Sequence, residues 1–148
     1  GGVLNAIKHF SNENFIIINP DTIWNLHHLK ELKLMEKVFF ENKKSKCLIL
    51  VAKKEKSFDQ TLKGDFNLKN NLITRNDKEN LKYIYTGLQI IKSEVFSDLN
   101  SDVFSINKIW DKLIENKELY GVESNFDFFH VSTLNIYNDL LKKNLDIN

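Results

Sequence analysis

Two short, uninterrupted apolar runs constrain the fold of this chain more than any other feature. Residues 15–19 read FIIIN and stop at Pro20-Asp21, and residues 46–52 read KCLILVA. Runs of this length without polar alternation are typical of central strands in a sheet that is covered on both faces. We therefore predict a sheet with helices on both sides and with both runs in its interior.

Apolar residues at helical spacing separate these runs from further strand patterns. Helices are predicted where apolar side chains return every three or four positions, over residues 2–10, 25–41, 105–115 and 133–143. Strand patterns, including a hairpin that turns at Asn70-Asn71, cover residues 64–68, 72–74, 83–92, 119–122 and 126–131. This alternation predicts an α/β fold, with a mixed, mostly parallel sheet flanked by helices.

Length and charge exclude several classes of protein. The chain has 148 residues, and its 21 basic and 20 acidic side chains leave a net charge of only +1. No strongly basic field is present that would recruit nucleic acid or an anionic membrane. No apolar stretch approaches the roughly 20 residues of a membrane span. Cys47 is the single cysteine, so no internal disulfide can form, and we expect a reducing, cytoplasmic setting.

Asp21 directly follows the first apolar run, after Asn19 and Pro20. A carboxylate at the end of a buried strand lies at the carboxyl edge of the sheet, where open α/β sheets bind ligands. Such a group suits Mg²⁺, which takes one or two protein oxygens together with substrate phosphates. A turn or helix-capping aspartate is the commoner reason for a Pro-Asp pair, and spacing alone leaves both interpretations open.

Three further positions interrupt strand patterns with glycine or polar residues. Gly64-Asp65 precedes an alternating strand, where the glycine would let a ligand approach the backbone or simply form a turn. Thr86-Gly87 lies inside the strand pattern of residues 83–92, which indicates a bulge or a close approach, of a ligand or of a packed helix. His130 stands in an apolar run, either as a hydrogen-bonded core histidine or as a contact to phosphate.

No familiar catalytic motif completes these candidates. The chain has no P-loop, no dinucleotide fingerprint and no HExxH pattern. Arg75, the lone arginine, could pair with a phosphate or be solvated near a turn. Composition and spacing thus predict an α/β domain with an anion or metal site at one edge of the sheet.

Five segments in order along the chain resemble the bacterial sugar-1-phosphate nucleotidyltransferases. The resemblance is to the branch of mannose-1-phosphate guanylyltransferases and N-acetylmuramate-1-phosphate uridylyltransferases. It covers the chain from residue 1 to about residue 140, and it is carried by GGV at residues 1–3, FIIINPDTIW at 15–24, KGDFNL at 63–68, YTGLQI at 85–90 and FHVST at 129–133.

The resemblance implies a Rossmann-like, GT-A-like fold and a transfer reaction. A sugar 1-phosphate would attack the α-phosphorus of a nucleoside triphosphate and expel pyrophosphate, in the cytoplasm, for cell-envelope polysaccharide. By the resemblance, Asp21 would hold Mg²⁺, and Gly2 would lie against the nucleotide base. The remaining substrate contacts would come from Asn19, Gly64, Asp65, Thr86, Gly87 and His130.

Three departures from the family pattern qualify this expectation. Pro20 stands where the family has glycine, and His130 stands where it commonly has a second metal-binding aspartate. The glycine-rich loop G-x-G-x-R-x-x-P-x-T, which binds the triphosphate in the family, does not occur in this chain. We therefore expect residues 1–148 to be the C-terminal part of a single nucleotidyltransferase domain, inactive by itself.

Two alternatives to an enzyme fragment stay open. The chain could be a non-catalytic sugar-phosphate or nucleotide-binding domain, or a regulatory subunit of the same fold. It could also be an unrelated α/β domain whose likeness to the family is accidental. A truncated sheet would leave an exposed edge and an uncovered apolar face, so we expect self-association or poor solubility.

Overall fold

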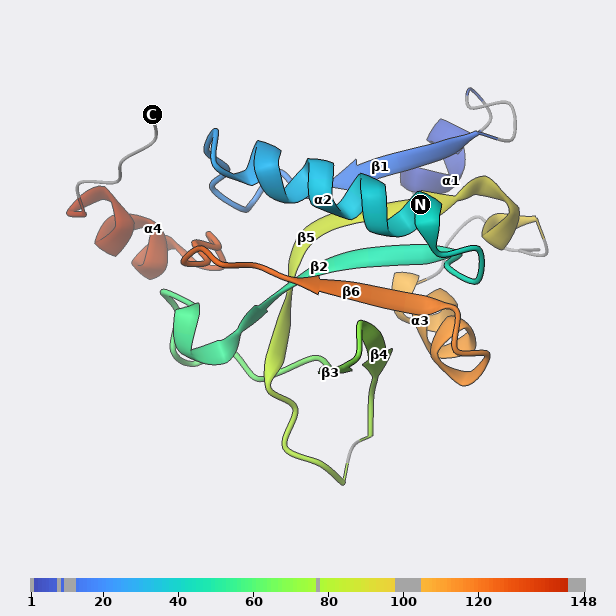
Figure 1. Ribbon diagram of the computed structural model, residues 1–148. Coiled ribbons are helices and arrows are strands. Elements are labelled where there is room, and N and C mark those ends of the chain that lie inside the picture. The colour runs from blue at the N-terminus through green and yellow to red at the C-terminus, as the bar shows by residue number, and fades with distance from the viewer. Residues whose placement is uncertain (1, 8, 10–12, 77, 98–104, 144–148) are drawn as a thin grey trace.

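The structure, a computed structural model, describes residues 2–7, 9, 13–76, 78–97 and 105–143. A six-stranded sheet with the order β1-β5-β2-β6-β4-β3 forms its centre (Figure 1). The strands are β1 Asn14–Ile18, β2 Cys47–Lys53, β3 Asn67–Lys69, β4 Leu72–Thr74, β5 Tyr83–Lys92 and β6 Leu119–Glu123. The helices are α1 Gly2–Ile7, α2 His28–Glu41, α3 Ile106–Glu115 and α4 Leu134–Leu141, with short 3₁₀ turns at Lys54–Lys56 and Ser93–Phe96.

Strand β2 lies between two hydrophobic cores, one on each face of the sheet. Its side chains alternate: Ile49 and Val51 pack with α3 and α1, whereas Leu48 and Leu50 pack with α2. Every residue of β2 except the last is buried. The central, two-sided position that the apolar run of residues 46–52 predicts is therefore confirmed.

The prediction of a central position for the other apolar run is wrong. Strand β1 lies at the edge of the sheet and pairs only with β5 among the strands of the described chain. Phe15 faces the core that contains α3, while Ile16 and Ile18 are 42% and 54% exposed on the opposite face. An uninterrupted apolar run indicates that both faces of a strand tend to be buried. It does not specify whether the strand lies in the middle or at the edge of the sheet.

The predicted α/β class with a mixed sheet is confirmed, but the prediction that the sheet is mostly parallel is wrong. Strands β2 and β6 run parallel, and the other paired strands of the described chain run antiparallel. The hairpin is also confirmed, because Asn70 and Asn71 both have positive φ, 50° and 62°, at the turn between β3 and β4.

One predicted strand and part of one helix differ in the structure. Residues 126–131 form no regular strand and make only isolated bridges, Thr22 with His130 and Ser57 with Phe128. The first helix ends at Ile7, and the predicted extension to residue 10 reaches outside the described residues. None of the helices in the described ranges is long and apolar enough to cross a membrane.

Candidate functional site

The loop after β1 is attached to β5 by hydrogen bonds from two of its residues. The Asn19 N–H donates to the Gly87 carbonyl at 2.8 Å, and the Thr22 hydroxyl donates to the Thr86 carbonyl at 2.8 Å. Thr22 is buried at this contact. These bonds hold the two residues between them, Pro20 and Asp21, at the end of β1, where the sequence predicts the Asp21 carboxylate.

A second set of bonds attaches the same loop to the segment that precedes α4. The Val131 N–H donates to the Asp21 carbonyl at 2.8 Å, and the Ile23 N–H donates to the Phe129 carbonyl at 2.9 Å. As a result, Nε2 of His130 lies 3.2 Å from Oδ2 of Asp21. The structure thus brings together Asp21 and His130, which the sequence resemblance assigns to the metal and substrate site.

A cavity of about 280 Å³, which we call the Asp21 cavity, opens beside this pair. Five residues that the sequence predicts as substrate contacts contribute to its lining: Asn19, Asp65, Thr86, Gly87 and His130. They come from the loop after β1, the approach to β3, the middle of β5 and the segment before α4. Residues as far apart along the chain as Asn19 and His130 therefore meet at one cavity.

Gly87 is required at this cavity by its backbone and by its neighbours. Its φ is +96°, and a Cβ there would lie 2.7 Å from the Asn19 Cβ and 3.2 Å from the Thr22 hydroxyl oxygen. The close approach that the sequence indicates is therefore made by the loop that carries Asp21. Neither a helix nor a ligand is needed to explain the glycine.

The other two glycines that the sequence predicts at the site, Gly64 and Gly2, are not among the described residues that line the cavity. A Cβ at Gly64 would overlap the carbonyl group of Leu81, so glycine is needed here to allow the close approach of the Leu81 backbone. Gly64 lies between two lining residues, Lys63 and Asp65, but is not itself in the cavity lining. Gly2 is the first residue of α1, and what surrounds it lies outside the described part of the structure.

The polar side chains of Asp65 and Thr86 are bound to the protein itself. Oδ2 of Asp65 accepts a hydrogen bond from the Tyr85 N–H at 2.9 Å, and burial raises the pKa of this carboxyl group despite that bond. The Thr86 hydroxyl donates to the Leu50 carbonyl at 3.0 Å. Both side chains shape the cavity wall and have limited capacity to bind a ligand directly.

Two polar side chains in the lining, those of Asn19 and Lys63, are available to bind a ligand. Within the described residues, neither the Asn19 carboxamide nor the Lys63 ammonium group has a hydrogen-bond or ion-pair partner. An amide and a cation at one cavity are suited to phosphate oxygens. Sequence reasoning missed Lys63, although its position directly before Gly64-Asp65 was a signal that could have identified it.

Tyr85 is another lining residue that the sequence did not single out. Its hydroxyl oxygen is buried and has no hydrogen-bond partner among the residues described. Burial is the main reason that its pKa is raised, with a further contribution from the Asp21 charge. The ring packs edge-on against Trp110 at 4.8 Å between centroids, so Tyr85 forms a neutral, rigid part of the wall.

Arg75 does not itself line this cavity, and it holds protein groups together. Its guanidinium pairs with Asp111 at 2.9 Å, bonds Asn107 at 2.9 Å and lies 4.4 Å above the Phe66 ring. These contacts engage both terminal nitrogens and one ring face. The phosphate-binding interpretation of Arg75 therefore finds no support.

The single carboxylate of Asp21 suits a metal ion that is also bound by substrate phosphates better than a metal ion that is held by protein side chains alone. No group of three or more His, Cys, Asp or Glu side chains in the described ranges could hold a metal. The Asp21 side chain is 48% exposed and offers one carboxylate, whereas neutral imidazole is a poor Mg²⁺ ligand. One carboxylate completed by substrate phosphates is a coordination that Mg²⁺ commonly accepts.

Comparison with known proteins finds likeness in structure but not in sequence. No protein-family model and no curated protein matches the chain. A protein assigned as a glucose-1-phosphate thymidylyltransferase from Bacillus anthracis, solved with sucrose, superposes with a TM-score of 0.71 at 18% identity. The inositol-1-phosphate CTP transferase of T. maritima gives 0.69 at 15%, and HddC from Yersinia pseudotuberculosis, solved with GMP-PN, gives 0.63 at 19%.

The coverage of these matches is unequal. The alignments include 99%, 94% and 93% of this chain, but only 61%, 57% and 58% of the respective solved chains. The chain therefore spans less than two thirds of the structures that it matches. Identities below 25% establish the fold alone, and the predicted Rossmann-like fold is confirmed. This chain has the fold of the sugar-1-phosphate nucleotidyltransferases, over somewhat more than half of their length.

Proposed function

We propose that residues 1–148 are the C-terminal part of a nucleotidyltransferase domain that transfers a nucleoside monophosphate from a triphosphate to a sugar 1-phosphate. The mannose-1-phosphate guanylyltransferase-like reaction is our specific candidate. The observation that carries the proposal is the cavity itself. It collects residues from four separate motif segments beside the Asp21–His130 pair, on the fold of proteins named for this chemistry.

The reaction needs charge neutralisation and in-line positioning more than it needs an acid or a base. A sugar-phosphate oxygen forms a bond to the α-phosphorus, while the bond from that phosphorus to the pyrophosphate oxygen breaks. In our proposal Lys63 and the Asn19 amide bind the phosphate of the sugar. Asp21 faces Nε2 of His130 and so positions the imidazole ring at the cavity wall, beside the phosphate of the sugar. Bound at Asp21, Mg²⁺ would supply further positive charge to the phosphates.

The proposal predicts that this chain alone binds a sugar phosphate but does not turn it over. The triphosphate-binding loop of the family is missing from the sequence. A coupled pyrophosphate-release assay with sugar 1-phosphates and all four nucleoside triphosphates tests this prediction. Clear turnover by residues 1–148 would show that the catalytic machinery is complete here, contrary to the proposal.

Binding is tested by isothermal titration with mannose 1-phosphate, with and without Mg²⁺. Asp21→Ala should abolish the Mg²⁺-dependent part of the affinity, and Lys63→Gln should weaken binding with or without the metal. Asp127→Ala is the matched control, because Asp127 is an exposed carboxylate three residues from His130 that does not line the cavity. Equal losses in Asp21→Ala and Asp127→Ala would contradict a specific role for Asp21.

A non-catalytic binding domain of the same fold is the second candidate. It is favoured by the protein-bound side chains of Asp65 and Thr86 and by an imidazole at the second acidic position. This candidate predicts an affinity for mannose 1-phosphate that needs no Mg²⁺ and survives Asp21→Ala. The same titration therefore separates the two functions.

A further inference from the structure

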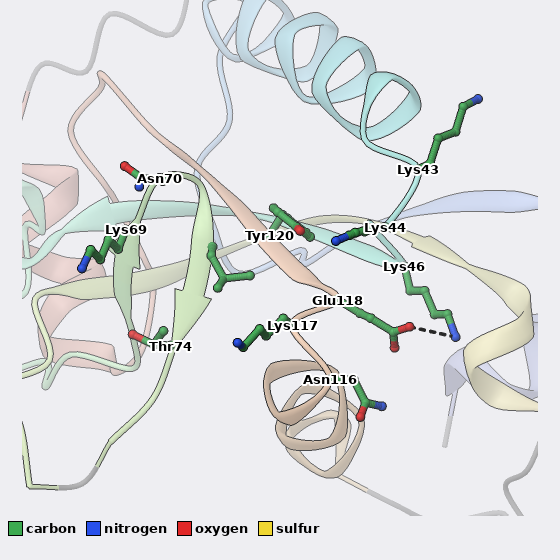
Figure 2. A pocket seen from close by; sticks show the side chains of 11 residues that line it. Lys43, Lys44, Lys46, Lys69, Asn70, Thr74, Asn116, Lys117, Glu118 and Tyr120 are labelled. Carbon is green, nitrogen blue, oxygen red and sulfur yellow. Dashed lines mark ion pairs between the residues drawn. The ribbon is translucent and has the colours of Figure 1, made fainter.

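A second, larger pocket lies at the opposite end of the sheet (Figure 2). It has a volume of about 630 Å³ and is formed where β2 and β6 begin, whereas Asp21 follows the end of β1, which runs in the same direction. Three turns surround it: the loop after α2, the β3–β4 hairpin and the turn after α3. The charged residues of this lysine pocket are Lys43, Lys44, Lys46, Lys69, Lys117 and Glu118.

The positive charge of the lysine pocket is largely uncompensated. Lys46 pairs with Glu118 at 3.2 Å, and no ion pair joins the other four lysines to an acidic residue of the described chain. The whole chain has 21 basic and 20 acidic side chains. With five lysines and one glutamate gathered here, the rest of the molecule carries a net negative charge. The pocket therefore concentrates positive potential at one place on an almost neutral protein.

Lys117 occupies a backbone position that favours glycine. Its φ is +58°, its N–H donates to the Ile114 carbonyl at 3.0 Å, and the Glu118 N–H donates to the Leu113 carbonyl at 2.7 Å. This pattern is a Schellman motif at the end of α3, in which glycine is the usual left-handed residue. A lysine there costs roughly 1 kcal/mol relative to glycine. Residues retained in strained conformations are concentrated at functional sites.

The shape of the lysine pocket suits a small molecule. Figure 2 shows the side chains of Lys44 and Lys117 both directed toward the β3–β4 hairpin, while Lys46 turns to Glu118 and Lys43 extends away. Half-buried Tyr120 contributes apolar surface to the lining of the lysine pocket. The volume lies within the range of small-molecule sites, which combine apolar walls with a few polar groups.

We propose that the lysine pocket binds an organic molecule carrying two or more phosphate groups, such as a nucleoside diphosphate. Two ammonium groups directed toward the same hairpin can each pair with one phosphate, and Tyr120 offers a surface for the organic part. A single-stranded nucleic acid is less well suited, because such ligands need a charged groove with exposed stacking side chains. This site lies apart from the Asp21 cavity and does not depend on the function proposed there.

Titration of the ¹⁵N-labelled chain with ADP, followed by NMR, tests the proposal. We expect saturable shifts in the amides of residues 43–46, 69–70 and 116–118, and an affinity that falls as salt rises. The double variant Lys44→Gln/Lys117→Gln should weaken ADP binding roughly tenfold. The control Lys30→Gln/Lys33→Gln removes the same charge from exposed positions of α2 and should leave the affinity unchanged.

Lys117→Gly separates ligand binding from a structural role. Lysines after α2 and α3 also complement the negative ends of those helices, which by itself would explain their presence. We expect Lys117→Gly to raise the free energy of unfolding while it weakens ADP binding. The proposal is overturned by ADP binding that Lys117→Gly leaves unchanged, or by an equal loss in the α2 control. Tighter binding of an oligo-dT strand than of ADP would also overturn it.

Discussion

The two ends of the sheet hold cavities that are built in opposite ways. At the end where β1 stops, backbone hydrogen bonds join the Asp21 loop to β5 and to residues 129–131, and Asp21 faces an imidazole. At the other end, lysines project from separate turns, and only Lys46 among them has an acidic partner in the described chain. The first arrangement fixes positions, whereas the second concentrates charge.

This difference has an energetic consequence. Substitutions in the Asp21 cavity should change the stability of the fold, because its wall is made of groups that hold the chain together. Substitutions of the lysines should change affinity for anions at little cost in stability, because exposed charges contribute little to folding. Four further experiments would break or sharpen this comparison.

The largest effect is expected from Gly87→Ala. The added Cβ would meet Asn19 at 2.7 Å in a backbone with φ of +96°, so we expect a loss of about 2–4 kcal/mol in urea denaturation. Gly121→Ala is the matched control near the lysine pocket, where the new Cβ would meet the flexible end of Ile73 at 2.5 Å. An equal loss in the two variants would contradict the special role of the Asp21 loop.

The next effect is expected at Glu31, a buried carboxylate of α2. It is 5% exposed and accepts hydrogen bonds from the Ser124 hydroxyl at 3.0 Å and the Asn125 N–H at 2.8 Å. Glu31→Ala should cost about 2–3 kcal/mol in thermal unfolding, because both donors lose their acceptor. Glu31→Gln keeps one acceptor oxygen and should cost less. Full stability in Glu31→Ala would show that α2 is not anchored at this end.

Asp59 and Asp65 should shift stability with pH in opposite directions. Hydrogen bonds from the Thr61 hydroxyl and N–H hold the pKa of Asp59 below its usual range, so its contribution is present at neutral pH and is lost as pH falls through that lowered pKa. Burial raises the pKa of Asp65. Ionisation there disfavours the folded state, so stability is lost as pH rises from the usual aspartate range through the raised pKa.

The variants Asp59→Asn and Asp65→Asn test these two opposite pH dependences of stability. Relative to the wild type, Asp65→Asn should gain stability as pH rises from 3 to 7, because it removes a carboxylate whose ionisation disfavours the folded state. Asp59→Asn should lose stability over the same range. Denaturation midpoints measured at several pH values provide the comparison, and parallel pH profiles for the two variants would refute it.

The smallest effect is expected at the open edge of β1. Ile16 and Ile18 are exposed there, and we predict that the chain self-associates through this edge. Ile18→Lys should lower the association constant severalfold in analytical ultracentrifugation, since charged side chains block edge pairing. Leu134→Lys in α4, a residue 72% exposed, is the control. A monodisperse wild-type monomer would contradict the prediction.

Much of the local structure could be predicted because it depends on neighbours in sequence. The strand at residues 83–92, the Asn70-Asn71 turn and the helix over residues 105–115 follow from periodicity and turn chemistry, and the structure has them at nearly those bounds. Residues 126–131 could not be predicted in this way. Their apolar pattern resembles a strand, yet they serve as a bridge between two loops.

The sequence by itself determined the α/β class, the buried strand β2 and five of the residues that line the Asp21 cavity. Only the tertiary structure decided that β1 lies at an edge, that the side chain of Asn19 packs closely against Gly87, and that lysines from three turns share one pocket. The physical reason is that apolar spacing encodes whether a side chain is buried. Which segments become neighbours depends on sheet order and on contacts between residues far apart in the chain.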